Sequence, residues 1–332
     1  MKNEKVASEL SNNNASASAA ENCSLMSNIL PKLKANAVGV QGLRPTMEDE
    51  HTIKQNILLH LGAQYPEQQV SYFAVYDGHG GSGCSAFMKK NLFHSVLRQL
   101  EARPDGLNAS TTETVEKHIK DAMRVAFIET DDSFLVKEAK ESRGSNKFEK
   151  NSGTTAITLL VHRGMLYCAN VGDSRCVLSR AKGAVELSSD QKAFRPDEEA
   201  RIKRAGGFVM NNRVMGKLAV ARAFGDAEFK DRASPLLREH NCRAAVVVAD
   251  PEFRVQPLVS DDEFAILACD GLWDVCTSAE AVRFVHEQLG RGKSVFEASK
   301  NLTSLALGKG STDNVSVLIV LFKDIPKTSI RN

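Results

Sequence analysis

Four aspartates of this 332-residue chain share one context, because each stands at the edge of an apolar, strand-like run. They are Asp77, Asp173, Asp270 and Asp313. An aspartate at a strand end usually forms a turn, and that alternative stays open for each residue taken alone. If the strands share a sheet, however, their ends converge and the carboxylates meet. Their mutual repulsion then requires a cation, so the fold has to bring distant strand ends to one metal-binding edge.

Strand-like runs rich in β-branched and aliphatic residues recur along the chain. They cover residues 72–76, 156–161, 165–170, 175–179, 264–269 and 315–322. Two short turns, Arg163-Gly164 and Gly172-Asp173-Ser174, separate neighbouring runs and favour antiparallel hairpins. Predicted helices cover residues 85–100, 112–136, 277–289 and 295–307, and a shorter helix begins near Pro196.

These helices occur in pairs before and after blocks of strands, rather than after each strand. The order predicts an α+β fold: a central antiparallel β-sandwich flanked by paired α-helices, in four α-β-β-α layers. We expect one domain over residues 35–324, between a flexible polar tail at 1–34 and a C-terminal tail at 325–332. The charged segment 190–250, named the flap below, is expected to contact substrate, although a solvated surface excursion fits the same composition.

Composition limits the classes of partner. A net charge of +2 gives no basic footprint for nucleic acid, and no apolar run approaches the length of a membrane span. Seven cysteines without a Cys-x-x-Cys pair indicate reduced, structural thiols. We therefore expect a cytoplasmic or nuclear protein, acting as a monomer, with no nucleic-acid or membrane partner.

Two short clusters add the groups that a metal-activated hydrolytic site needs. The first places Arg44 close to Glu48 and Asp49, and the second is Asp77-Gly78-His79. Hard cations prefer carboxylate and carbonyl oxygens, and a glycine leaves the backbone carbonyl unobstructed. The acidic set, with Asp270 and Asp313, exceeds the needs of one octahedral ion and predicts two Mg²⁺ or Mn²⁺ ions. Zinc is disfavoured because no His or Cys joins the set at ligand spacing.

Arg44 and His79 complete this hypothesis. The planar guanidinium of Arg44 suits phosphate oxygens, and His79 titrates near neutrality and could protonate a leaving alkoxide. The alternatives are a surface salt bridge from Arg44 to Glu48 and an ordinary turn histidine. Pro45 weighs against the salt bridge, because it disfavours helix at the preceding residue.

Seven segments in order resemble those of the metal-dependent serine/threonine protein phosphatases of type 2C. They are RPTMED (44–49), YDGHGG (76–81), SGTTA (152–156), ANVGDSR (169–175), AFGD (223–226), DGLWD (270–274) and TDNV (312–315). The resemblance covers roughly residues 39–322. The loop Asp190-Gln191-Lys192-Ala193 lacks the His and Pro that often follow the family's Asp, and Ala221 replaces a common Ser. Both departures lie around the flap and concern substrate preference.

The resemblance implies roles for individual positions. Asp77 would bridge both metals with help from the Gly78 carbonyl. Asp270 and Asp313 would complete one coordination sphere, and Glu48 would support the other, largely through water. The remaining implied positions are Arg44 for phosphate, His79 as general acid, Asp173 and Asp274 for a weaker third metal, and Asp49 and Asn314 for hydrogen bonds behind the ligands.

The predicted activity is hydrolysis of phosphoserine and phosphothreonine in proteins, by direct attack of water activated at the two-metal centre. A catalytically dead scaffold is one rival, but such a protein should have lost ligands, and every expected carboxylate is present. A metal-dependent nuclease or other phosphodiesterase is another rival, but this chain lacks the basic surface expected for binding nucleic acid.

Overall fold

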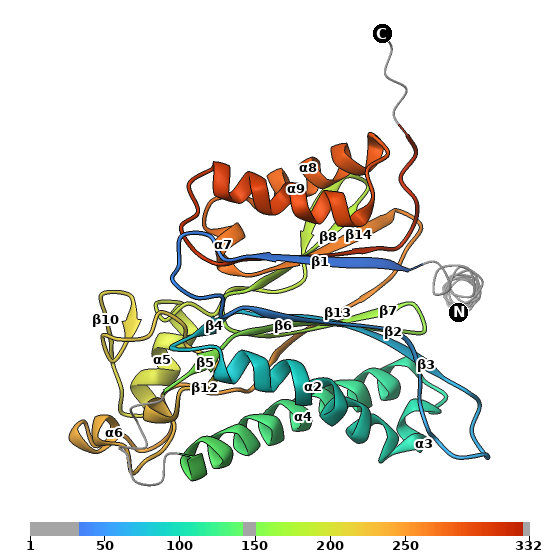
Figure 1. Cartoon of the computed structure of the whole chain (residues 1–332). Helices are drawn as coiled ribbons and strands as arrows, with labels where there is room; N and C mark the ends of the chain where they lie inside the picture. The colour runs from blue at the N-terminus through green and yellow to red at the C-terminus, as the bar shows by residue number, and fades with distance from the viewer. Residues whose placement is uncertain (1–32, 142–150, 328–332) are drawn as a thin grey trace, which may run out of the picture.

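Two five-stranded antiparallel sheets stack face to face in the computed structural model, which describes residues 33–141 and 151–327 (Figure 1). In spatial order, one sheet contains β1 (Lys34–Val40), β15 (Val315–Leu321), β14 (Asp262–Ala268), β8 (Arg175–Arg180) and β9 (Gly183–Glu186). The other contains β13 (Glu252–Pro257), β7 (Met165–Val171), β6 (Ala156–His162), β3 (Gln69–Tyr76) and β2 (Glu50–Leu58).

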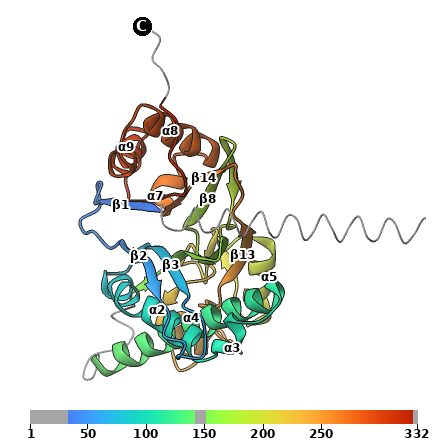
Figure 2. The same cartoon turned by 90° about the vertical axis from the view of Figure 1, so that its right-hand side faces the viewer.

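Paired helices cover the two outer faces (Figures 1 and 2). The pair α8 (Ser278–Gly290) and α9 (Val295–Gly308) covers the first sheet, and α2 (Gly83–Glu101) and α4 (Thr112–Glu141), with the short α3 (Pro104–Leu107), cover the second. The predicted α+β sandwich of four α-β-β-α layers is therefore confirmed. Both α8 and α9 begin with a capping box, and the one predicted from the sequence joins Thr277 and Glu280.

Strand β3 contributes side chains to two layers of the hydrophobic core. Tyr72, Ala74 and Tyr76 point toward α2 and α4, whereas Phe73 and Val75 point into the space between the sheets. All five are fully buried. Because side chains alternate along a strand, a continuously apolar run can serve both faces at once. This packing fixes the end of β3, where Asp77 follows.

Smaller elements gather at one end of the sandwich. A three-stranded sheet contains β5 (Gly153–Thr154) between β4 (Gly78–His79) and β12 (Phe224–Gly225). Beside it are the hairpin of β10 (Val209–Met210) and β11 (Arg213–Val214) and the helices α5 (Pro196–Arg204), η2 (Ala227–Phe229), α6 (Pro235–Glu239) and α7 (Asp270–Trp273). The flap packs around a small core of its own, which includes Ile202, Val214 and Phe229. It is thus a folded unit rather than a solvated excursion.

The hairpin expected at Gly172-Asp173-Ser174 is wrong. Strand β7 belongs to one sheet and β8 to the other, so the chain crosses between layers at this turn. After the crossing, Cys176 and Leu178 contribute to the core between the sheets from the sheet that contains β14. The other expected hairpin is confirmed, because His162 and Met165 pair across Arg163-Gly164.

The described chain extends slightly into both predicted tails. Strand β1 begins at Lys34, and Leu33 and Ile325 are buried against the core. Residues 1–32 and Cys23 lie outside the described part. The six cysteines within it are free and buried, as expected for structural thiols. Among the described helices, none combines the length and apolarity needed to span a membrane.

Candidate active site

A cavity of about 420 Å³ opens where the ends of the two sheets meet. Apart from Asp49 and Asp274, every site residue predicted from the sequence lines it. These are Arg44, Glu48, Asp77, Gly78, His79, Asp173, Asp270, Asp313 and Asn314. Asp77 and Asp173 follow strands of one sheet, whereas Asp270 and Asp313 adjoin strands of the other. The carboxylates therefore converge because two layers end together, not because their strands share one sheet.

Three carboxylates form the centre of this cavity. Asp77, Asp173 and Asp270 each place an oxygen within 4.8 Å of the others. Burial raises the pKa of Asp77 and Asp270, and the neighbouring carboxylates raise it further, so that the pKa of Asp270 reaches about 7. Such a cluster resists full ionisation unless a cation neutralises it. Its all-oxygen donor set suits a hard divalent cation.

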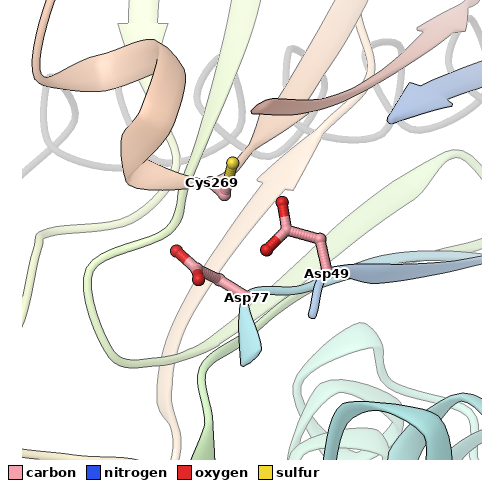
Figure 3. Close-up of side chains that lie close together, drawn as sticks. All are labelled: Asp49, Asp77 and Cys269. Carbon is pink, nitrogen blue, oxygen red and sulfur yellow. The ribbon is translucent and has the colours of Figure 1, made fainter. Parts of the chain in front are cut away.

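Asp49 lies directly behind this cluster and is only 5% exposed. Its carboxylate, that of Asp77 and the thiol of Cys269 approach one another within 4.8 Å (Figure 3). Neither oxygen of Asp49 accepts a hydrogen bond from the described residues, and burial raises its pKa to about 6. A buried carboxylate without partners is costly. Its orphaned oxygens fit a site that a cation and its water molecules complete.

Lys192 provides a cation at one side of the cluster, a role that was not predicted from the sequence. Its Nζ donates to Asp173 Oδ2 at 2.5 Å and lies 3.9 Å from carboxylate oxygens of both Asp270 and Asp274. Burial alone would lower the pKa of Lys192, but the carboxylates, Asp173 first, raise it above its ordinary value. Asp274 has a largely exposed side chain at the end of α7. Lys192 thus occupies the side where the resemblance implies a weaker third metal.

Arg44 lies at the mouth of the cavity, and Asn314 holds the loop that carries it. Arg44 Nη2 donates to Asp313 Oδ2 at 2.6 Å, so the salt bridge considered with Glu48 does not form. The Asn314 amide nitrogen donates to the carbonyls of Gln41 and Thr46, and its oxygen accepts from the Glu48 backbone N–H. Asn314 is buried. These three bonds fix the position from which Arg44 and Glu48 project.

Gly78 shows why a side chain is excluded at this point. A Cβ built there would lie 2.3 Å from the Glu48 backbone oxygen, which is too close for any other residue. The close approach brings the loop of Glu48 against the end of β3, which positions Asp77. Glu48 itself accepts hydrogen bonds from Thr46 Oγ1 and from the Gly81 N–H.

His79 has a partner, Asp226, that was not predicted from the sequence. Its Nε2 lies 2.8 Å from Asp226 Oδ2, and the Asp226 side chain is 2% exposed. Gly153 passes so close to this pair that a Cβ there would collide with both side chains. Burial alone would lower the pKa of His79, but Asp226 raises it overall. The signal was present in the AFGD segment at 223–226, but nothing in its pattern linked Asp226 to a histidine 147 positions earlier.

The geometry defines a carboxylate-lined cavity at one end of a four-layer sandwich, and comparisons with known proteins identify the family that has this architecture. The model of the Protein phosphatase 2C family matches residues 34–315. "Protein phosphatase 1B" of Bos taurus is 33% identical over 90% of this chain and 58% of its own length. "Probable protein phosphatase 2C T23F11.1" of Caenorhabditis elegans is 36% identical over 85% of this chain and 72% of its own length.

Solved structures share the architecture. The structure titled "Structure of a C.elegans sex determining protein" has a TM-score of 0.69 at 25% identity, over 88% of this chain and 65% of that one. A serine-threonine phosphatase 2C from Toxoplasma gondii has a TM-score of 0.68 at 21% identity, over 88% of this chain and 95% of that one. The chain belongs to the protein phosphatase 2C family. Members of this family are metal-dependent, in keeping with the acidic clusters described above.

The raised pKa values predict how cation binding depends on pH. In the metal-free chain, Asp270 (pKa about 7) and Asp49 (pKa about 6) retain protons that an unfolded aspartate releases at lower pH. The folded state therefore loses stability as pH rises from the ordinary aspartate pKa of 3.8 to the raised values of about 6 and about 7. A bound cation offsets that loss. We expect Mn²⁺ or Mg²⁺ to raise the Tm of the full chain more at about pH 8 than at about pH 5.

Differential scanning calorimetry of two variants provides the control. Asp270→Asn should remove most of the cation-induced rise, whereas Asp121→Asn, which changes an exposed carboxylate on α4, should retain it. An equal rise at both pH values in the unmodified chain would contradict the assignment of these carboxylates to the cation site.

Proposed function

We propose that this chain hydrolyses phosphoserine and phosphothreonine in proteins at a Mg²⁺ or Mn²⁺ centre. The observation that carries the proposal is the convergence of the carboxylate cluster, Arg44 and the His79–Asp226 pair on one cavity. Phosphate hydrolysis needs charge neutralisation, a grip on the phosphate and a proton for the leaving group. Each requirement has a candidate group here.

Asp77, the Gly78 carbonyl, Asp270, Asp313 and Glu48 would hold two ions. Asp49 would lie behind them and accept hydrogen bonds from water molecules that the ions hold. When bound, the ions would activate the attacking water and neutralise phosphate charge. Asp173 and Asp274 are the candidates for a weaker third ion, at the place where Lys192 now lies. These assignments rest on the family resemblance together with the donor set of the cavity.

Arg44 would grip the phosphate. Its side chain is 59% exposed, and an ion pair of this kind contributes only about 0–1 kcal/mol. The guanidinium can therefore leave Asp313 at little cost and present its planar fork to phosphate oxygens. While the guanidinium changes partner, the loop that Asn314 holds would keep Arg44 at the mouth of the cavity.

His79 would protonate the leaving alkoxide. An ionised carboxylate can only accept, so Asp226 binds the protonated Nε2 of His79 and leaves Nδ1 for the substrate. Asp226 also favours the charged imidazolium, the form that a general acid requires. We propose Asp226 as a positioning residue that sets both the orientation and the protonation of His79.

The remaining expectations are proposals of the same kind. Phosphorylated proteins would be the substrates, and the enzyme would act as a monomer. The free, buried cysteines of the described part favour a reducing compartment, the cytosol or nucleus.

Turnover of a phosphothreonine peptide tests the proposed reaction. We expect hydrolysis with Mn²⁺ or Mg²⁺, none with excess EDTA, and no cleavage of single-stranded DNA. Asp77→Asn should lower kcat by more than the roughly 10²–10⁴-fold of one acid–base group, because it weakens both ion sites at once. Asp121→Asn, an exposed carboxylate on α4, is the matched control and should stay near the unmodified rate.

Two results would overturn the proposal. No turnover with either metal would favour a catalytically dead scaffold. Near-normal turnover of Asp77→Asn at saturating Mn²⁺ would remove Asp77 from the two-ion centre.

The leaving group tests His79 and Asp226 together. Serine and threonine alkoxides need a proton to depart, whereas p-nitrophenolate barely does. His79→Gln should therefore lower kcat on the phosphothreonine peptide by roughly 10²–10⁴-fold and spare p-nitrophenyl phosphate. Asp226→Asn should show the same selectivity with a smaller loss.

His60→Gln is the control, because His60 is exposed and lies outside the cavity. Equal losses on both substrates would show that His79 maintains the shape of the metal site instead of donating a proton.

A further inference from the structure

A second cavity, of about 600 Å³, lies between the C-terminal half of α4 and the flap segment 227–250. No residue is shared between its lining and that of the active-site cavity. In Figure 1 this end of α4 runs toward the segment that carries α6. We name this cavity the α4 groove. Nothing in the proposed reaction uses it.

The α4 side of the groove is an apolar face that the core does not use. Ile128, Leu135, Val136 and Ala139 recur at helical spacing along it. Ile128 is 42% exposed and Val136 52%, although both are large and apolar. The core-facing residues of the same helix, such as Phe127 and Phe134, lie on a different face and are buried. Helix α4 therefore has a second apolar face, which does not pack against the core.

The opposite side of the groove comes from the flap. Val247, Val248 and Ala249 line it, together with Ala227 and Ala245. The floor is an ion pair between Asp131 and Lys230, whose side chains are each 8% exposed. Asp131 also accepts a hydrogen bond from the Gly225 N–H at 2.7 Å, which ties α4 to β12. The groove thus has a rigid floor and two apolar walls.

The charges around these walls are mostly negative. Five carboxylates line the groove, against one lysine. They are Asp131, Asp132, Glu138, Asp231 and Asp250. Lys230 pairs with Asp131, and Arg124, outside the lining, pairs with Asp250. Asp131 belongs to the floor and Glu138 is buried, so the acidic rim of the groove consists of Asp132, Asp231 and the partly exposed Asp250. The surface that a ligand meets is apolar at its centre and acidic at this rim.

We propose that the α4 groove binds an amphipathic segment of a partner protein, with its apolar side chains in the groove and its Lys or Arg side chains against the acidic rim. Apolar anchors at helical spacing and complementary charge are the features by which grooves recognise amphipathic helices. A second copy of this chain fits poorly, since a two-fold contact would place one acidic rim against another. This surface would select partners independently of the catalytic residues.

A synthetic peptide tests the proposal directly. The probe is a fluorescein-labelled helix of Leu and Lys, with Leu at the i, i+3, i+4 and i+7 positions, added to the full chain while anisotropy is measured. Ile128→Asn and Val136→Asn remove apolar wall, and Asp132→Lys reverses a rim charge. Each of the two Asn variants should weaken peptide binding by about tenfold, which is the scale of one buried aliphatic side chain. Asp132→Lys should also weaken binding, because it places a like charge against the Lys side chains of the peptide.

The same helix provides matched controls. Val125 is 41% exposed, close to Ile128, but it lies outside the groove, and Glu113 is an exposed carboxylate in the first turn of α4. Val125→Asn and Glu113→Lys should leave binding within about twofold of the unmodified chain. A peptide with Glu in place of every Lys should bind more weakly than the Lys peptide. Unchanged Tm values establish that the variants are folded.

Several outcomes would overturn the proposal. Equal losses in the control variants, or equal binding of the Glu peptide, would mean that the Lys peptide binds elsewhere. An increase in peptide affinity in Phe148→Ser would mean that residues 142–150 of this chain occupy the groove. A concentration-dependent dimer abolished by Ile128→Asn would assign the groove to a second copy.

Discussion

Repulsion among carboxylates at one end of the sandwich is the constraint on which the rest of the site depends. Asp77, Asp173 and Asp270 each place an oxygen within 4.8 Å of the others, and Asp49 is buried behind them with no hydrogen-bond partner among residues 33–141 and 151–327. Left ionised and unneutralised, such a cluster would oppose the packing that brings β3, β7 and β14 together. The apolar layers supply the energy that holds these strand ends in place, and a cation relieves the opposing charge.

The surrounding residues are arranged to tolerate this cluster. Lys192 neutralises part of it from the flap side, and Arg44 pairs with Asp313 at the mouth. Asn314 and the absence of a side chain at Gly78 keep the loops that carry the carboxylates close together, which limits how far the carboxylates can separate. A preorganised cluster of like charges lowers the stability of this end of the fold, as is common at functional sites.

The sequence predicted the layers and most of the cavity, because both depend on strong local patterns. Continuous apolar runs marked the buried strands, and the aspartates that end them marked the site. Half-buried strands such as β1, β2 and β13 were missed, since polar residues interrupt their apolar pattern. Crossing of the chain between sheets at Asp173 was also missed, because a short turn has the same residues whichever sheet its second strand joins.

The missed site residues depended on contacts between distant segments. Asp226 meets His79, and Lys192 meets Asp173, only after the flap has folded onto the sandwich. The AFGD segment singled out Asp226 but did not indicate its partner, and nothing in the sequence distinguished Lys192 from the other charged residues of the flap. The α4 groove could not be predicted from the sequence either, because its second wall comes from the flap and forms only when the flap has folded against α4.

Electron paramagnetic resonance of bound Mn²⁺ tests the central claim most directly. If Asp77 is shared between two ions, titration of the metal-free chain near neutral pH should fill two sites that give a spin-coupled spectrum. Asp77→Asn should abolish that coupling. A single isolated Mn²⁺ signal, or two uncoupled ions that persist in Asp77→Asn, would contradict the claim that these strand ends converge to hold a two-ion centre.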